Sequence, residues 1–169
     1  AVALVAGLEP GQPVWITGRV ESFRRRTQVV VSSIAAEPGA DPAEFLPKSP
    51  VPVAELWRRL TELLLGVRHR PLKRLLRAFF EDQAFHADFS RAPAAKGAHH
   101  AYVHGLLEHT VSVGELAQKV AGHYPAVSRD LLVAGALLHD VGKVAELTLG
   151  PPIDYTDQGR LEGHLVLGV

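Results

Sequence analysis

A lone histidine, His109, and an adjacent histidine–aspartate pair, His139-Asp140, have the side chains that bind metal ions. Both occur in segments that are otherwise strongly apolar. An unpaired polar group buried among apolar side chains costs roughly 1–3 kcal/mol, and a buried charge costs more, so these residues need partners. A divalent cation is one such partner, and it would make this region a hydrolytic centre.

Nitrogen and oxygen ligands of this kind suit Mn²⁺, Fe²⁺, Zn²⁺ or Mg²⁺. The chain has no cysteine, which excludes thiolate ligands and disulfide bonds. A bound cation lowers the pKa of water toward neutrality and screens a phosphoryl oxygen, so that hydroxide can attack phosphorus. Lys143 lies three residues beyond Asp140 and could reach a non-bridging phosphate oxygen. We therefore assign Asp140 and Lys143 to catalysis.

Other polar residues are weaker candidates. His164 could supply a fourth metal ligand, and Lys96, His99 and His100 form a short segment that could face a phosphate. Adjacent histidines in a loop are more often surface residues, and a single histidine in a helix is more often a hydrogen-bonded core residue. The set of His109 with His139-Asp140 nevertheless favours a metal, because the pair directly follows an apolar run.

Two predicted helices must position these groups. The first covers residues 105–124, with His109 on the same stripe as apolar side chains at 3-4-3-4 spacing. That stripe consists of Leu106, His109, Val113, Leu116 and Val120. The second covers residues 131–138 and is apolar on every side, which predicts a helix buried all round. We expect Ser128 to cap it and Gly142 to terminate or kink the chain after it.

The preceding sequence changes character twice. Residues 12–34 alternate apolar with polar side chains and are rich in β-branched residues, which predicts strands with Arg24-Arg25-Arg26 in a hairpin turn. Proline is concentrated in residues 36–52, which predicts a linker. Helices are then expected over residues 53–67, 71–80 and 82–91. The predicted fold is mainly α, with a small N-terminal β segment.

Charge and hydropathy limit the classes of partner. Eighteen basic and eighteen acidic side chains give a formal net charge of zero, so any nucleic-acid contact must come from local patches. The basic residues between positions 55 and 80 are one such patch, although simple solvation explains them equally well. The sequence has neither a signal peptide nor an apolar run near 18 residues, which predicts a cytoplasmic protein without membrane contact.

The chain resembles the HD phosphohydrolase superfamily, and more closely the YhaM-type 3′-5′ exoribonucleases. The central match is Glu108-His109-Thr110 with Leu137-Leu138-His139-Asp140-Val141-Gly142-Lys143. Further matching segments are Phe45-Leu46-Pro47, Leu56-Trp57, Pro93-Ala94-Ala95-Lys96, His99-His100, Gly105-Leu106-Leu107, Tyr124-Pro125, Arg129-Asp130-Leu131-Leu132, Tyr155-Thr156, Gly159-Arg160-Leu161 and Gly163-His164. The resemblance runs from about Gly11 to the last residue.

This resemblance implies a partial OB-like β segment over residues 1–35, a linker over 36–52 and a helical HD domain over 53–169. It also implies that family segments at both ends are missing, including a late acidic metal ligand, so we expect a truncated chain. The family removes nucleotides from RNA 3′ ends with a divalent cation, typically Mn²⁺. The implied metal ligands are His109, His139, Asp140 and His164, and Arg24, Arg25 and Arg26 would follow a single-stranded backbone.

The function predicted from the sequence is a metal-dependent 3′-5′ exoribonuclease acting on single-stranded RNA. One alternative is an HD-type phosphohydrolase that acts on a nucleotide or a cyclic dinucleotide. Another is a non-catalytic RNA-binding module that keeps the helical core for packing. The sequence leaves open the choice between RNA and DNA and the oligomeric state, a homo-oligomer included.

Overall fold

The computed structural model describes residues 7–169, apart from the side chain of Ala43, and divides into two compact units. One unit contains the chain up to Leu46 together with Gly150–Pro152, and the other contains Pro47–Leu149 and Ile153–Val169. The boundary after Leu46 falls inside the linker that the sequence predicts. The first six residues of the predicted β segment lie outside the described part of the chain.

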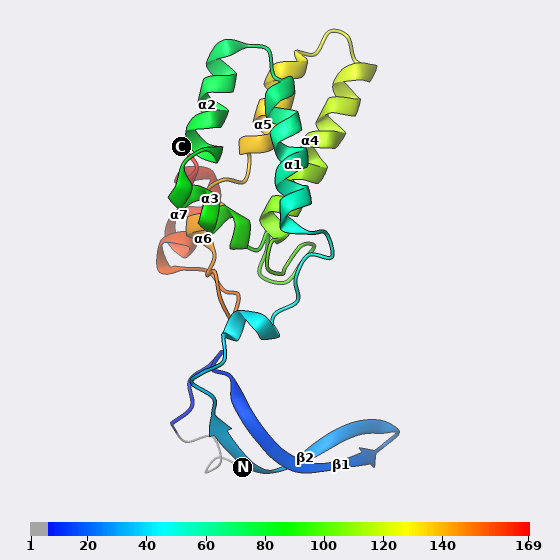
Figure 1. Ribbon diagram of the computed structural model, residues 1–169, viewed down its shortest axis with the longest axis vertical. Helices are drawn as coiled ribbons and strands as arrows, with labels where there is room; N and C mark the ends of the chain where they lie inside the picture. The colour runs from blue at the N-terminus through cyan, green and yellow to red at the C-terminus, as the bar shows by residue number, and fades with distance from the viewer. Residues whose placement is uncertain (1–6) are drawn as a thin grey trace. The chain divides into compact units, whose positions relative to one another are not determined.

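The first unit is built on an antiparallel hairpin of β1 (Val14–Phe23) and β2 (Arg26–Ala36), followed by the short helix η2 (Pro42–Phe45) (Figure 1). The turn consists of Arg24 and Arg25, whose φ angles are +48° and +64°. Positive φ at both central residues defines a type I′ turn, whose twist matches the flanking strands. The predicted hairpin is therefore confirmed, but Arg26, which was expected in the turn, is the first residue of β2. Among residues 7–169 it forms the only sheet, so the complete OB fold remains an expectation.

The second unit is helical, which confirms the predicted fold class. Its helices are α1 (Val53–Gly66), α2 (Arg70–Phe80), α3 (Gln83–Arg91), α4 (Gly105–His123), α5 (Arg129–Leu138), α6 (Lys143–Glu146) and α7 (Asp157–Leu167). Their starts follow from local sequence. Asp82 accepts a hydrogen bond from the Phe85 backbone N–H (2.8 Å), and Thr156 caps α7 through the Gly159 N–H (2.9 Å). Ser128 caps α5 as predicted.

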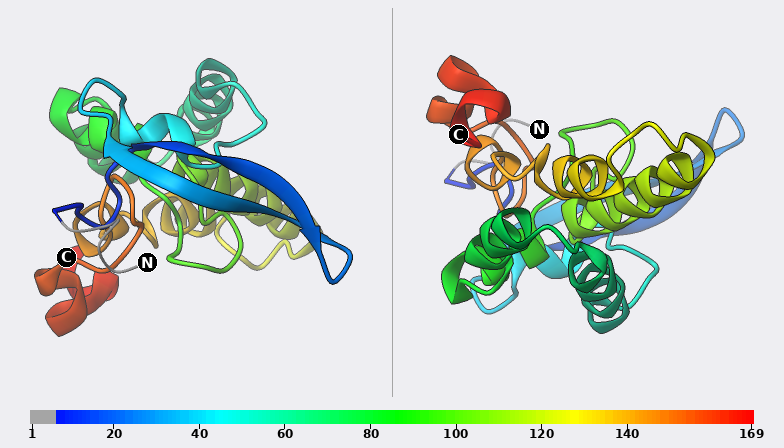
Figure 2. Two further views of the ribbon diagram at one scale, coloured as in Figure 1. Left: turned by 90° about the horizontal axis from the view of Figure 1, so that it is seen from below. Right: turned by 90° about the horizontal axis from the view of Figure 1, so that it is seen from above.

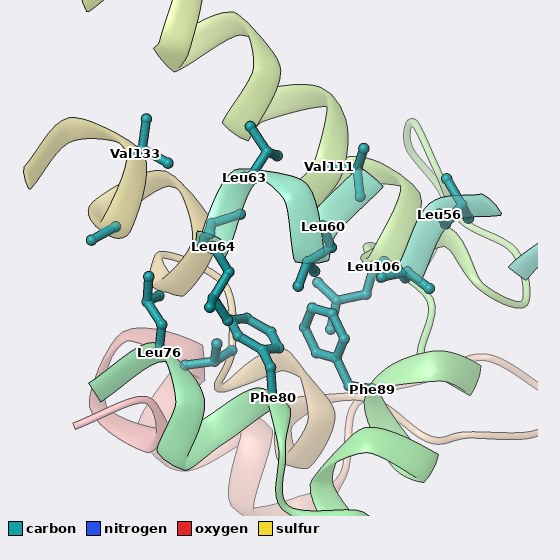
Figure 3. Packing of buried hydrophobic residues seen from close by; sticks show 14 of the residues in the cluster. Leu56, Leu60, Leu63, Leu64, Leu76, Phe80, Phe89, Leu106, Val111 and Val133 are labelled. Carbon is teal, nitrogen blue, oxygen red and sulfur yellow. The ribbon is translucent and has the colours of Figure 1, made fainter. Parts of the chain in front are cut away.

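The hydrophobic core lies inside the helical unit and draws on α1 to α5 (Figure 3). The leucines of α1 alternate at helical spacing, and those at positions 56, 60, 63 and 64 are buried. Aromatic rings close the core on one side, where Phe80 and Phe89 meet edge to face with centroids 5.4 Å apart. The larger labelled members are Leu56, Leu60, Leu63, Leu64, Leu76, Phe80, Phe89, Leu106, Val111 and Val133.

Helices α4 and α5 lie side by side (Figures 1 and 2), but the buried face of α4 differs from the prediction. Leu116 is 60% exposed and Val120 is 37% exposed, so the apolar stripe that includes His109 reaches the core only at its first member, Leu106. Small residues make the close contact instead, since a side chain at Gly114 would come within 2.8 Å of Leu63 and 3.1 Å of Leu137. The buried face of α4 is therefore the one whose small residues allow neighbouring helices to approach closely, not the one with the largest apolar side chains.

Helix α5 also differs from its prediction. It buries Val133, Ala134 and Leu137, whereas Leu131 is 61% exposed, so the helix is not buried all round. Helix α5 is thus apolar on all sides, but only one of its faces packs against the rest of the helical unit. Among residues 7–169, no helix combines the length and the apolar character needed to span a bilayer.

Candidate metal centre

Three ligand atoms from two helices converge at one point. His109 lies in the second turn of α4, His139 is the residue that ends α5, and Asp140 follows it directly. His109 Nε2 lies 3.2 Å from His139 Nε2 and 3.4 Å from Asp140 Oδ2, and His139 Nε2 lies 3.2 Å from the same oxygen. The end of α5 therefore allows two consecutive residues to face one position, and the structure brings together the three residues singled out in the sequence.

The proton positions on His139 fit a cation at this point. Its Nδ1 lies 2.8 Å from the backbone carbonyl oxygen of Ala136, which can only accept a hydrogen bond. Nδ1 therefore carries the proton in the neutral ring, and the Nε2 lone pair points toward Asp140 Oδ2 and His109 Nε2. Acceptor atoms this close repel one another unless a proton or a cation lies between them. The two nitrogens and one carboxylate oxygen suit a divalent metal.

Asp140 supplies the negative charge of the centre. It is only 5% exposed, and burial opposes its ionisation. Hydrogen bonds from His109, His139 and Lys143 outweigh that burial and hold the pKa of Asp140 far below its usual range. Without a cation, a second proton on His139 Nε2 can lie between the two atoms, and this hydrogen bond to Asp140 raises the pKa of His139, although burial acts against the shift. The carboxylate is therefore ionised at neutral pH.

Lys143 lies at the same carboxylate. Its Nζ is 2.8 Å from Asp140 Oδ2 and donates a second hydrogen bond to the backbone oxygen of Ala94, also at 2.8 Å. An ammonium group has three N–H donors, so a third can donate to a phosphate oxygen. The predicted contact of Lys143 with substrate remains a prediction, and the structure adds its role as a partner of Asp140.

His164 lies on the other side of Asp140. Its Nε2 is 3.5 Å from Asp140 Oδ1, and its Nδ1 is 2.9 Å from Oε1 of the buried Glu146. It is thus next to the three converging atoms without being one of them. Gly142 packs against the same segment, because a side chain there would overlap the His164 carbonyl oxygen. Helix α5 ends at Leu138, before Gly142, and Gly142 directly precedes α6 with an ordinary φ of −65°.

The predicted phosphate-facing histidines lie beside His109. The ring centroids of His99 and His100 are each 5.5 Å from that of His109. Burial lowers the pKa of His100. Lys96 instead pairs with Asp154 at 2.8 Å. The predicted RNA-contacting residues Arg24, Arg25 and Arg26 belong to the hairpin of the other unit.

Sequence reasoning missed the polar residues that hold these histidines. The Tyr102 hydroxyl donates to Glu108 Oε2 (2.8 Å) and lies 2.9 Å from His100 Nδ1. Burial, with the bond to Glu108, raises the pKa of Tyr102 to about 12, so the phenol stays protonated at neutral pH. The position of Glu108 directly before His109 could have drawn attention to it. Nothing in the spacing of Glu146 indicates its role.

An apolar groove of about 550 Å³ runs between α4 and α5 and reaches the centre. Its walls include Leu116 and Val120 on one side and Leu131 on the other, and His139 lies at its edge. The exposed stripe of α4 and the exposed side of α5 therefore form one surface. His139 belongs to both this groove and the cluster of ligand atoms.

Comparison with known proteins gives two results. Residues 106–169 match the HD domain family. The chain is also 37% identical to the 3′-5′ exoribonuclease YhaM of Listeria monocytogenes, over 94% of this chain and 51% of that protein. The YhaM exoribonucleases of Bacillus subtilis and Oceanobacillus iheyensis are 35% and 34% identical over 95% and 96% of this chain, each covered to 51%. The chain thus spans about half the length of these curated relatives, and no solved structure matches it significantly.

Proposed function

Because this chain carries an HD domain and is a relative of the YhaM exoribonucleases, we propose that it is a metal-dependent hydrolase that removes nucleotides from the 3′ end of single-stranded RNA. The observation that carries this proposal is the convergence of His109 Nε2, His139 Nε2 and Asp140 Oδ2 within hydrogen-bond distance of one another. We assign the metal to Mn²⁺, with Fe²⁺, Mg²⁺ and Zn²⁺ as alternatives that the same ligands accept, and the activity to the cytoplasm.

A divalent cation at these atoms would lower the pKa of a water molecule and screen the phosphoryl oxygens. Asp140 and the two imidazoles would hold it, and His164 is the candidate fourth ligand. Hydrolysis adds the water oxygen to phosphorus and breaks the bond to the 3′ oxygen of the preceding nucleotide. Lys143 keeps Asp140 in place and donates to a phosphoryl oxygen as negative charge develops there.

The remaining predicted contacts act on the substrate outside the metal ligands. His99 and His100 lie beside His109, where they can donate to the terminal phosphate or ribose. The guanidinium groups of Arg24, Arg25 and Arg26 follow the phosphate backbone of the strand. Lys96 reaches the phosphate only if it exchanges its ion pair with Asp154.

The test uses 5′-labelled single-stranded RNA with Mn²⁺. We expect a ladder of products shortened from the 3′ end, and we expect Asp140→Asn to abolish it. Asp88→Asn, which changes an exposed aspartate of α3, is the matched control and retains activity.

Other outcomes separate the alternatives. Turnover of free nucleotides or cyclic dinucleotides without RNA shortening would favour the small-molecule hydrolase. RNA binding that survives Asp140→Asn, with no cleavage and no metal in the wild-type protein, would favour the binding module. Cleavage of single-stranded DNA at an equal rate would widen the substrate class.

A further inference from the structure

We propose that Glu146 is a positioning residue that fixes the ring of His164 so that its Nε2 lone pair faces the metal position at Asp140. This inference rests on the proposed function, because it assigns a role in holding the same cation. Nothing in the sequence pattern points to Glu146, a buried acid in the four-residue helix α6.

Two hydrogen bonds to one oxygen carry the proposal. Glu146 Oε1 accepts from the His164 backbone N–H at 3.0 Å and lies 2.9 Å from His164 Nδ1. The backbone N–H can only donate, so Oε1 is the accepting atom, and the Nδ1 that faces it must carry the ring proton. In the neutral ring the lone pair is then on Nε2.

The opposite edge of the ring faces the metal centre. His164 Nε2 lies 3.5 Å from Asp140 Oδ1, the oxygen that does not face His109 and His139. A lone pair opposite a carboxylate oxygen is the same arrangement that His139 makes with Asp140 Oδ2. In both pairs, a proton or a cation between the two atoms would offset their repulsion. A ligating histidine is characteristically oriented by a carboxylate on its other nitrogen, which sets the tautomer and the ring angle.

The backbone is shaped to make this contact. Gly163 interrupts α7 with φ +71° and ψ 159°, a conformation that favours glycine, and thereby turns His164 toward Glu146. On the other side, the Glu146 carbonyl oxygen accepts from the Thr156 N–H at 2.9 Å. A side chain at Gly159 would overlap this carbonyl group. Both partners of the carboxylate–imidazole contact are therefore fixed.

The first measurement is Mn²⁺ affinity of the metal-free protein by calorimetry. We expect Glu146→Ala to weaken binding about 10- to 100-fold, as loss of such an orienting partner does elsewhere. Glu146→Gln keeps an accepting oxygen and should restore most of the affinity. In a His164→Ala background, Glu146→Ala should have no further effect, since the two residues act as a unit. Glu162→Ala, an exposed acid of α7, is the matched control.

The second measurement reads the ring directly. Nitrogen-15 NMR of the metal-free wild-type protein should show His164 protonated on Nδ1, and Glu146→Ala should move the proton to Nε2. This measurement does not depend on the protein being catalytically active. If Glu146→Ala does not fold, the tautomer of His164 in the wild-type protein still tests the proposal. A His164 ring that is protonated on Nε2 overturns it.

The outcomes also separate this proposal from the proposed function. A wild-type protein that binds Mn²⁺ and shortens RNA, with affinity and tautomer unchanged in Glu146→Ala, overturns the positioning role alone. A wild-type protein that binds no divalent metal overturns the metal-dependent function.

Discussion

At the scale of single residues, the two oxygens of Asp140 organise the centre between them. Oδ2 faces both His109 and His139, and Oδ1 faces His164. Lys143 balances the charge of this buried carboxylate. A carboxylate with this many donors is ionised over the whole physiological pH range, which a cation site requires.

The stability of the metal-free protein should therefore depend on pH through this pair. The pKa of Asp140 is lowered, so its contribution is present above its unfolded value near 4 and is lost as pH falls further. The pKa of His139 is raised, so its contribution is present below its unfolded value near 6.5 and is lost as pH rises through the folded value. Urea unfolding in EDTA should show the largest difference between wild type and Asp140→Asn between about pH 4 and 6.5. A difference that does not vary with pH would contradict this coupling.

Tyr102 provides a second prediction at this scale. Tyr102→Phe removes the hydroxyl that donates to Glu108 and contacts His100, while the ring remains. We expect the free energy of unfolding to fall by about 1 kcal/mol, because Glu108 loses a partly buried donor. RNA cleavage should slow while Mn²⁺ affinity stays unchanged, since His100 is not among the three ligands.

The control for this change is Tyr124→Phe, at a residue that is 56% exposed. Unfolding curves and cleavage rates of the two variants are compared directly. Equal effects in both variants would show that the Tyr102 hydroxyl has no special role.

At the scale of elements, the hairpin turn is unusual in composition. Type I′ turns favour Asn-Gly, because both central residues need positive φ, yet here both are arginines. The turn therefore carries backbone strain and has two cationic residues at its tip. In the proposed function, these two side chains contact phosphates of the RNA strand.

Replacing this turn separates stability from binding. Arg24→Asn with Arg25→Gly should make the hairpin more stable and weaken binding of single-stranded RNA. The slope of log affinity against log salt should become shallower by about 0.7 for each phosphate that the variant no longer neutralises. Arg24→Lys with Arg25→Lys, which keeps the charge, is the control and should keep the slope. If the slope is unchanged in the Asn-Gly variant, Arg24 and Arg25 do not contact RNA phosphates.

Elements were predictable from the sequence where a local signal decides them. Helical spacing of leucines and the cap Ser128 predict helix starts, and the flanking strands predict the turn at Arg24. The buried face of α4 could not be predicted in this way. Gly114 lies on that face because it packs against Leu63 and Leu137, which are far away in the sequence, and a glycine adds nothing to a hydrophobic pattern. Residue type alone identified His109, His139 and Asp140. The contact of Glu146 with His164 joins residues 18 positions apart and depends on the folded chain, so the sequence does not predict it.

At the scale of the whole molecule, the residues that the structure describes form one hydrophobic core and two units. All members of that core lie in the helical unit, as do the candidate metal ligands. The hairpin leaves apolar side chains exposed, among them Val20 at 71% and Val29 at 54%. The net charge of zero gives no general attraction to a polyanion, so the proposed binding of RNA depends on local clusters of basic side chains.

This division predicts that the helical unit folds and binds metal by itself. A chain of residues 47–169 should unfold cooperatively at nearly the same temperature as the whole protein and bind Mn²⁺ with the same affinity. Its affinity for single-stranded RNA should fall, because Arg24, Arg25 and Arg26 are removed. Calorimetry and RNA binding at matched salt test this expectation. Loss of cooperative unfolding would show that the helices need the first unit for stability.

The absence of a side chain at Gly142 has a further consequence. A β-carbon at this position would overlap the His164 carbonyl oxygen and lie 2.7 Å from the Gly168 nitrogen, so a single added carbon would act as a wedge between the two segments. Gly142→Ala would force the chain carrying His164 outward without altering any polar group. One added carbon atom would thus separate the His164 ring from the Asp140 carboxylate. The distance between the backbone at Gly142 and the backbone at His164 therefore limits how closely these two side chains can approach.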